Sequence, residues 1–135
     1  MNHLAASIPE SHVGILTGKN YAHIATLMRD GSPQVTPVWV DYDGRDIIIN
    51  TAEGRTKVRN LDREPRVALS VIDHENPYRY IQVRGRVRER TQEGAEAHID
   101  ALARRYMGVE HYPGHDPAHP RVIYRIEPEH VQTMG

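Results

Sequence analysis

The chain of 135 residues contains no cysteine and no phenylalanine. The absence of cysteine excludes disulfides, thiolate metal sites and cysteine nucleophiles, and it fits a reducing, cytoplasmic location. No apolar run approaches the roughly 20 residues of a membrane-spanning helix, and the first residues show no signal-peptide pattern. Without phenylalanine the core must be aliphatic, with seven tyrosines and one tryptophan as the available aromatic residues.

Charge is nearly balanced, with 17 basic and 18 acidic side chains and a net charge of −1. This balance disfavours a general nucleic-acid binder and a protein of anionic membrane surfaces. A chain of this length can bury roughly two thirds of its unfolded surface. We therefore expect a single domain over residues 1–135 with a core of its own.

Turn signals and hydrophobic periodicity predict a mainly β fold. Helices are expected over 8–17 and 55–64, and a third helix after Thr91, which is expected to cap it, with an apolar stripe. Strands are expected over 21–28, 34–42, 67–72, 78–90 and 121–126, with another, apolar on both faces, starting at residue 47. The turns Asp30-Gly31 and Asp43-Gly44 predict that the first three strands form an antiparallel meander. Together these features favour a closed or split antiparallel β-barrel of six strands with about three peripheral helices.

The segment from Asn50 to Asn60 joins a buried strand to the start of a helix. Three cations stand within five residues: Arg55, Lys57 and Arg59. Hydroxyl donors flank them: Thr51 and Thr56. Backbone N–H groups at a helix start favour an anion, so this segment predicts an anion site. The alternative is a solvated basic helix paired with its acidic neighbours: Glu53, Asp62 and Glu64. No glycine-rich phosphate loop is present, so a nucleoside triphosphate fold is not indicated.

Two segments place aromatic residues where a planar ligand could be held. Pro37 interrupts a strand, which marks an edge, a bulge or an opening of the sheet, and Trp39 follows it. The alternative is that Trp39 is an ordinary core residue. The segment 77–80 begins a strand with two tyrosines and an arginine; it either frames a ring or phosphate, or is a plain strand edge.

The remaining motifs carry little chemistry. The histidines at 111, 115 and 119 have a helical spacing, but the prolines among them forbid a helix, so no metal site is predicted. No nucleophile–base set is evident either. If the protein is an enzyme, a bound cofactor is expected to supply the chemistry.

Several ordered segments together resemble a known superfamily: 30–40 (Asp-Gly-Ser-Pro-Gln-Val-Thr-Pro-Val-Trp-Val), 49–51, 57–61, 65–69 and 83–87. This set is similar to the pyridoxamine 5′-phosphate oxidase-like split β-barrel superfamily. It is most similar to the short flavin/deazaflavin oxidoreductases called FDOR-B, many of which use coenzyme F420 in actinobacteria. The similarity runs from about His12 to Pro128.

The resemblance implies a cytoplasmic homodimer with two cofactor sites at the interface. The cofactor-binding residues it implies within one chain are Thr36, Pro37, Val38, Trp39, Asn50, Thr51, Arg55, Lys57 and Asn60. The residues it implies from the partner subunit are Tyr78, Arg79 and Tyr80. True pyridoxamine-phosphate oxidases have a C-terminal extension after the barrel, and its absence here is expected to exclude that activity.

The leading hypothesis is an oxidoreductase that uses reduced coenzyme F420 to transfer a hydride to a small electron-poor organic substrate. The alternatives are an FMN-dependent flavoprotein and a non-enzymatic cofactor carrier. An RNA-binding barrel is disfavoured by the net charge and by the lack of an exposed aromatic series. No catalytic residue is assigned. Three tyrosines are candidate proton donors: Tyr78, Tyr80 and Tyr112.

Overall fold

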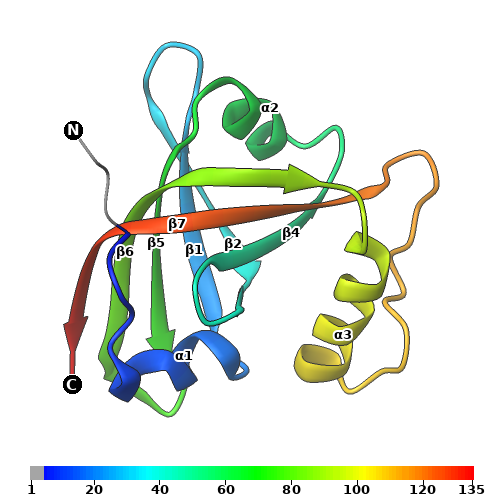
Figure 1. The fold of residues 1–135 in the computed structure, drawn as a ribbon. Helices are drawn as coiled ribbons and strands as arrows, with labels where there is room; N and C mark the ends of the chain where they lie inside the picture. Colours follow the sequence, from blue (N-terminus) through cyan, green and yellow to red (C-terminus); the bar gives the residue numbers. More distant parts are fainter. Residues whose placement is uncertain (1–4) are drawn as a thin grey trace.

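The computed structural model describes residues 5–135 and contains a single, strongly curled antiparallel sheet with three α-helices around it (Figure 1). The elements in chain order are a 3-10 turn η1 (Glu10–His12), α1 (Val13–Thr17), β1 (Tyr21–Leu27), β2 (Pro33–Trp39), β3 (Asp41–Tyr42), β4 (Ile47–Ala52), α2 (Thr56–Arg63), β5 (Arg66–Asp73), β6 (Asn76–Thr91), α3 (Ala95–Met107) and β7 (Arg121–Met134). The mainly β, barrel-like class predicted from the sequence is confirmed.

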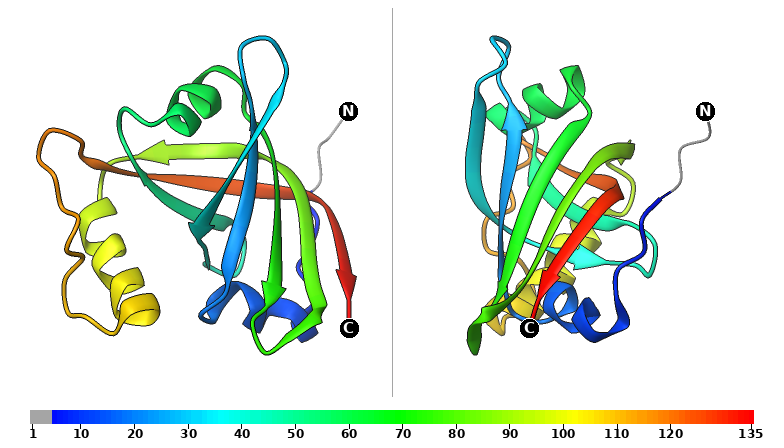
Figure 2. Two further views of the ribbon diagram at one scale, coloured as in Figure 1. Left: turned by 180° about the vertical axis from the view of Figure 1, so that it is seen from behind. Right: turned by 90° about the vertical axis from the view of Figure 1, so that its left-hand side faces the viewer.

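The seven strands follow the spatial order β2-β1-β5-β6-β7-β4-β3. The long strands β6 and β7 run side by side and carry the sheet around its bend, as two further views show (Figure 2). Helices α1 and α2 lie at opposite ends of the curled sheet, and α3 stands to one side of it (Figure 1). None of the helices in the described part of the chain has the length and apolarity that a membrane crossing requires.

Alternating burial explains why these segments form strands around one core. In β1 the residues Ala22, Ile24 and Thr26 are buried while their neighbours are more exposed. Strand β4 is buried throughout, as its apolar run predicts. Both α1 and α2 contribute apolar residues to the same core, which is aliphatic apart from Tyr124. The predicted stripe of α3 is also buried: Ala95, Ile99, Leu102, Ala103 and Tyr106.

The predicted meander and the count of six strands are wrong at one point. Strands β1 and β2 form the expected hairpin, but the predicted strand 34–42 breaks at Val40. The last two residues of the predicted strand form β3, which pairs with β4 at the far edge of the sheet. The neighbours of β1 are β2 and β5, so β2 does not lie beside β4 as a meander requires. The backbone of Val40 is satisfied by α3, since its N–H donates to the Tyr106 hydroxyl (3.2 Å) and its C=O accepts from Arg105 Nη1 (3.0 Å). The chain thus crosses from one edge of the sheet to the other, giving seven strands.

The predicted end of the last strand at Pro128 is also wrong. Strand β7 continues to Met134 and pairs with the first half of β6. The register shifts next to Gly85, which lies opposite Pro128, so the proline sits at an irregularity where a ladder hydrogen bond is dispensable. A Cβ on Gly85 would lie 2.1 Å from the Glu127 carbonyl oxygen, so this close approach requires glycine.

The helix boundaries differ slightly from the prediction. The region 8–17 divides into η1 and α1 rather than forming one helix. Thr91 accepts a hydrogen bond from Glu93 N–H (3.0 Å), so it closes the turn before α3, and the residue that precedes the helix is Gly94. Helix α2 begins one residue later and ends one residue earlier than predicted.

Candidate functional site

A cleft of about 260 Å³ opens beside the predicted proline-bearing strand. Its apolar wall consists of Tyr21, Pro37, Val38, Trp39, Ile99 and Tyr112. Its polar floor consists of Asn50, Thr51, Arg55, Lys57 and Arg121. Residues from β1, β2, β4, α2, α3, β7 and the loop after α3 therefore meet at one place, and the loops alone do not form the site.

The aromatic wall is held in place from behind. Trp39 stacks on Tyr106 with ring centroids 5.0 Å apart and planes 5° apart, and Tyr112 meets Trp39 edge-on at 5.9 Å. The Tyr106 hydroxyl is fixed in turn, because it donates to the Asn20 carbonyl (2.6 Å). Both interpretations of Trp39 therefore hold in part: it packs against α3 and it lines the cleft. A wall backed in this way presents a preformed flat surface.

The floor gathers three cations, Arg55, Lys57 and Arg121, which we call the cleft cations. Lys57 is 7% exposed and Arg121 8% exposed. Burial, and then the neighbouring Arg55 and Arg121, lower the pKa of Lys57 below its usual range. Burial lowers the pKa of Arg121 as well, with Arg55 acting in the same direction and Tyr112 and Glu96 opposing it. The cleft cations therefore repel one another in a partly dry site, which favours binding of an anion.

The acidic neighbours along this segment do not pair with these cations. Glu53 and Asp62 both contact Arg90, and Glu64 pairs with Arg66. Within residues 5–135, no ion pair reaches a cleft cation. The alternative of a solvated basic helix paired with its own acids therefore does not describe Lys57. Arg59 is exposed, as that alternative expects, but it bonds back to the Gly54 carbonyl (2.8 Å) and to Thr56 Oγ1 (3.2 Å) rather than to an acid.

The start of α2 borders the floor of the cleft. Arg55 is the N-cap residue of this helix, in extended conformation, and no side chain caps the first turn. Lys57 and Val58 follow at adjacent positions, so Lys57 reaches the cleft while Val58 enters the core. The N–H groups of an uncapped first turn attract anions, so they add to the effect of the cations.

Arg121 is a site residue that the sequence did not reveal. Its Nε donates to Asn50 Oδ1 (2.9 Å) and its Nη2 to the Asn50 carbonyl (3.2 Å), while its guanidinium lies 5.1 Å from the Tyr112 ring centre. It reaches the floor because β7 pairs with β4, with Arg121 opposite Ala52. No local pattern predicts pairing between strands 70 residues apart. Tyr21 and Ile99 were missed for the same reason, and Tyr112 was considered only as a proton donor.

Five predicted site residues lie outside the cleft lining of this chain. Thr36 lies on β2 just before the lining residues Pro37, Val38 and Trp39. Asn60 is buried and donates to Thr26 Oγ1 (3.0 Å). The other three open β6: Arg79 binds the Ser11 carbonyl, and Tyr78 is 80% exposed. The assignment of Tyr78, Arg79 and Tyr80 to a partner subunit stays a prediction.

The loop after α3, residues 108–120, is anchored on α3 and carries Tyr112 to the cleft. Asp100 accepts from Tyr112 N–H (2.8 Å) and contacts His115 Nε2 (2.8 Å), and the other ring nitrogen of His115 contacts Glu96. The hydrogen bond to Asp100 raises the pKa of His115. The Tyr112 N–H, then His115, lower the pKa of Asp100 to about 2. In residues 5–135, no three or more His, Asp or Glu side chains are grouped so as to hold a metal ion.

Comparison with known families agrees with this geometry. The family model described as pyridoxamine 5′-phosphate oxidase matches residues 8–135, almost the whole chain. The chain belongs to the pyridoxamine 5′-phosphate oxidase family. Membership confirms the split-barrel superfamily that the sequence motifs indicated.

Solved structures refine the placement within this family. A protein named F420 reductase is 38% identical, with a TM-score of 0.83 over 93% of this chain and 98% of that one. A conserved hypothetical protein of Mycobacterium tuberculosis is 22% identical (TM-score 0.69, 99% of this chain and 89% of that one). A heme storage protein of Vibrio cholerae is 12% identical (TM-score 0.67, 96% of each chain). The last two share the fold alone.

Proposed function

We propose that this protein binds coenzyme F420 in the cleft and uses the reduced coenzyme to reduce a small electron-poor organic substrate. The observation that carries the proposal is a pair of buried cations, Lys57 and Arg121, with the exposed Arg55 repelling both, beside a preformed aromatic wall. Such a site suits a ligand that is planar at one end and anionic at the other. The 38% identity to a protein named F420 reductase supports the choice of coenzyme.

The residues of the cleft divide the work of holding such a ligand. Arg55, Lys57 and Arg121 suit its anionic groups, since guanidinium and ammonium groups form charge-assisted hydrogen bonds with phosphate and carboxylate oxygens. Pro37, Val38 and Trp39 provide the surface for the ring, and Asn50 and Thr51 offer polar contacts between the two ends. When bound, the coenzyme supplies the hydride.

The contribution of the chain to the reaction is mainly orientation. A rigid wall and a charged floor hold two reactants at fixed distance and angle, which removes much of the entropic barrier of a bimolecular step. Of the three tyrosines predicted as proton donors, Tyr112 lines the cleft, whereas Tyr78 and Tyr80 lie at the start of β6. We expect the product to take its proton from Tyr112 or from solvent. The plausible substrate classes are conjugated enones and quinones.

FMN is the second candidate ligand. The match to the pyridoxamine 5′-phosphate oxidase family supports FMN as a candidate. The cleft cations would hold the single phosphate of FMN in the same way as the anionic groups of F420. Absorbance titrations of the purified protein with oxidised F420 and with FMN separate the two. Turnover of an enone and a quinone with the reduced form of the bound cofactor then separates an enzyme from a carrier. Tight binding of F420 with turnover is the expected result, and binding of neither cofactor would contradict the proposal.

We further propose a homodimer. The outer face of β1, β2 and β5 exposes apolar side chains, among them Tyr21 (49%), Val35 (62%) and Ile72 (44%), and Tyr21 continues into the cleft. A second copy on this face would bury these residues and complete the open side of the cleft. Light scattering should give twice the chain mass of 15.4 kDa at micromolar concentration; a monomer with cofactor bound would contradict the dimer.

A further inference from the structure

One buried amide, that of Asn50, connects the cleft floor with the first turn of α3. Its Nδ2 donates to the Ala95 carbonyl (2.9 Å) and lies 3.1 Å from His98 Nδ1, while its Oδ1 accepts from Arg121 Nε (2.9 Å). Asn50 is 7% exposed, so its amide relies on these partners within the protein. The amide therefore couples a cleft cation to a histidine outside the cleft.

The orientation of this amide is determined by two partners, one that can only donate a hydrogen bond and one that can only accept. Arg121 Nε can only donate, so it requires the oxygen of Asn50. The Ala95 carbonyl can only accept, so it requires the nitrogen. The second N–H of Asn50 then points at His98 Nδ1, which must be an unprotonated acceptor.

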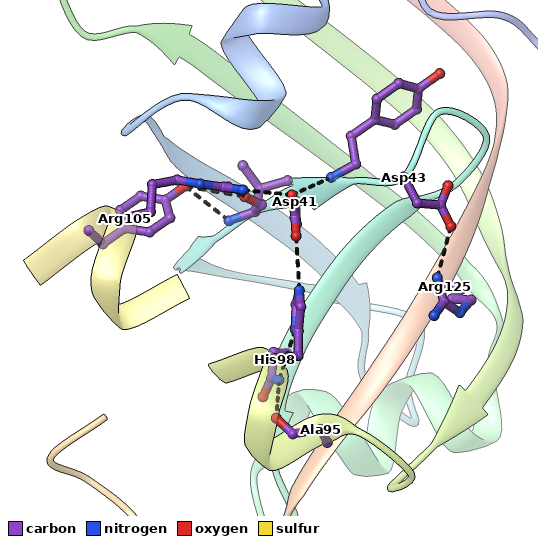
Figure 3. A network of polar contacts seen from close by, with 10 residues as sticks. Asp41, Asp43, Ala95, His98, Arg105 and Arg125 are labelled. Carbon is purple, nitrogen blue, oxygen red and sulfur yellow. Dashed lines mark hydrogen bonds and ion pairs between the residues drawn. The ribbon is translucent and has the colours of Figure 1, made fainter. Parts of the chain in front are cut away.

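The other ring nitrogen of His98 completes the assignment. With Nδ1 accepting, a neutral ring carries its proton on Nε2, which donates to Asp41 Oδ2 (3.0 Å). Arg105 Nη2 donates to the second oxygen of Asp41 (2.9 Å). Burial opposes ionisation of this carboxylate, but the hydrogen bonds from His98 and Arg105 hold the pKa of Asp41 well below its usual range. Figure 3 shows the chain from Arg105 through Asp41 to His98 and Ala95.

We propose that His98 is a positioning residue for the anion site: through its Nδ1 acceptor it fixes the Asn50 amide, and the amide fixes the guanidinium of Arg121 in the cleft. This role rests on the proposed function, in which Arg121 holds an anionic group of the cofactor. His98 lines no part of the cleft. Its sequence neighbourhood on α3 gives no hint of the role, because Asn50 is 48 residues away.

Two substitutions separate the two ring nitrogens. In His98→Asn, the side-chain oxygen stands near the position of Nδ1 and keeps the acceptor for Asn50, while the contact with Asp41 is lost. In His98→Gln, the side-chain amide reaches the position of Nε2 and keeps the donor for Asp41, while the acceptor for Asn50 is lost. Both variants remove the imidazole ring from α3, so both lose its packing. A difference between the two variants therefore reports the hydrogen bond to Asn50.

The first readout needs no cofactor. Proton exchange of the Arg121 Nε–H with water, followed by NMR in the ligand-free protein, should be slow in the wild type and in His98→Asn and clearly faster in His98→Gln. Assignment through Arg121→Lys identifies the signal. Equal exchange rates in His98→Gln and the wild type, or equal acceleration in both variants, would overturn the positioning role.

The second readout is affinity for F420 and FMN. For whichever cofactor the wild type binds, His98→Gln should weaken binding roughly three- to tenfold, the range expected for one neutral hydrogen bond, and His98→Asn should restore most of it. Equal weakening in both variants would contradict the proposal. If the wild type binds neither cofactor, the proposed function fails, and the exchange measurement alone decides the role of His98.

Discussion

Two groups of cations in this molecule have opposite surroundings. The first, which we call the paired cluster, consists of Arg88, Arg90 and Arg125 on β6 and β7. Each of them meets a carboxylate: Arg88 contacts Asp46, and Arg90 contacts Glu53 and Asp62. Arg125 contacts Asp43, the one of these pairs that Figure 3 labels. The second group is the cleft cations, whose charged groups form no ion pair within residues 5–135; Glu96 accepts only from the backbone N–H of Arg121 (3.2 Å).

The pKa directions record this difference. The hydrogen bond to Asp46 raises the pKa of Arg88, whereas burial and mutual repulsion lower the pKa values of Lys57 and Arg121. The first group stabilises the fold because its charges are matched within the chain. The second has no ion pair within residues 5–135, although Asn50 and Tyr112 hold Arg121, and we attribute the unmatched charge to binding an external anion. The predictions below test whether substitutions in the paired cluster change stability and substitutions of the cleft cations change cofactor affinity.

The largest effect on stability is expected in the paired cluster. Asp46 is fully buried, so Arg88→Met leaves a buried carboxylate without its cation. We expect a loss of about 2–3 kcal/mol in the free energy of unfolding, and no change in cofactor affinity. Denaturant unfolding measures the first quantity and titration the second. As a control, Arg66→Met removes an exposed pair with Glu64 and should cost less than about 1 kcal/mol.

The largest effect on affinity is expected at Lys57. A charge-assisted hydrogen bond contributes about 1.5–3 kcal/mol, so Lys57→Met should weaken cofactor binding roughly 10- to 100-fold. The ligand-free protein should be as stable as the wild type or more stable, because the substitution removes a buried cation without an ion-pair partner. Lys19→Met removes the same charge from an exposed position and serves as the matched control. Strong destabilisation of the ligand-free variant would make Lys57 a structural residue.

Local patterns predicted the parts of this molecule that depend on neighbours in sequence. Trp39, Arg55 and Lys57, which line the cleft, were assigned to the candidate site because a proline in a strand and a cationic helix start are local signals. Arg121 and Tyr112 were not found as binding residues, since their place depends on the pairing of β4 with β7 and on the anchoring of a loop by Asp100. The predicted meander was wrong for the same reason: the strand breaks at Val40, whose backbone bonds to the side chains of Arg105 and Tyr106 on α3, far away in sequence.

A smaller effect is expected from the loop that carries Tyr112. His115 bridges Asp100 and Glu96, and its raised pKa means that the folded protein favours the imidazolium. The stabilisation is therefore complete below the ordinary pKa of about 6.5 and is lost as the pH rises through the raised value. The melting temperature of the wild type should exceed that of His115→Gln at pH 5.5, and the difference should shrink by pH 8.5. A difference independent of pH would contradict this ionic anchoring.

The most direct test of the account uses the single tryptophan as a reporter. Trp39 lies in the wall beside the cleft cations, so a planar cofactor bound there should quench its fluorescence in a saturable way. We predict such quenching with F420 in the wild type, and a midpoint shifted roughly 10- to 100-fold upward in Lys57→Met. Saturable binding seen by absorbance without a change in Trp39 fluorescence, or the same midpoint in both proteins, would show that the cofactor binds elsewhere.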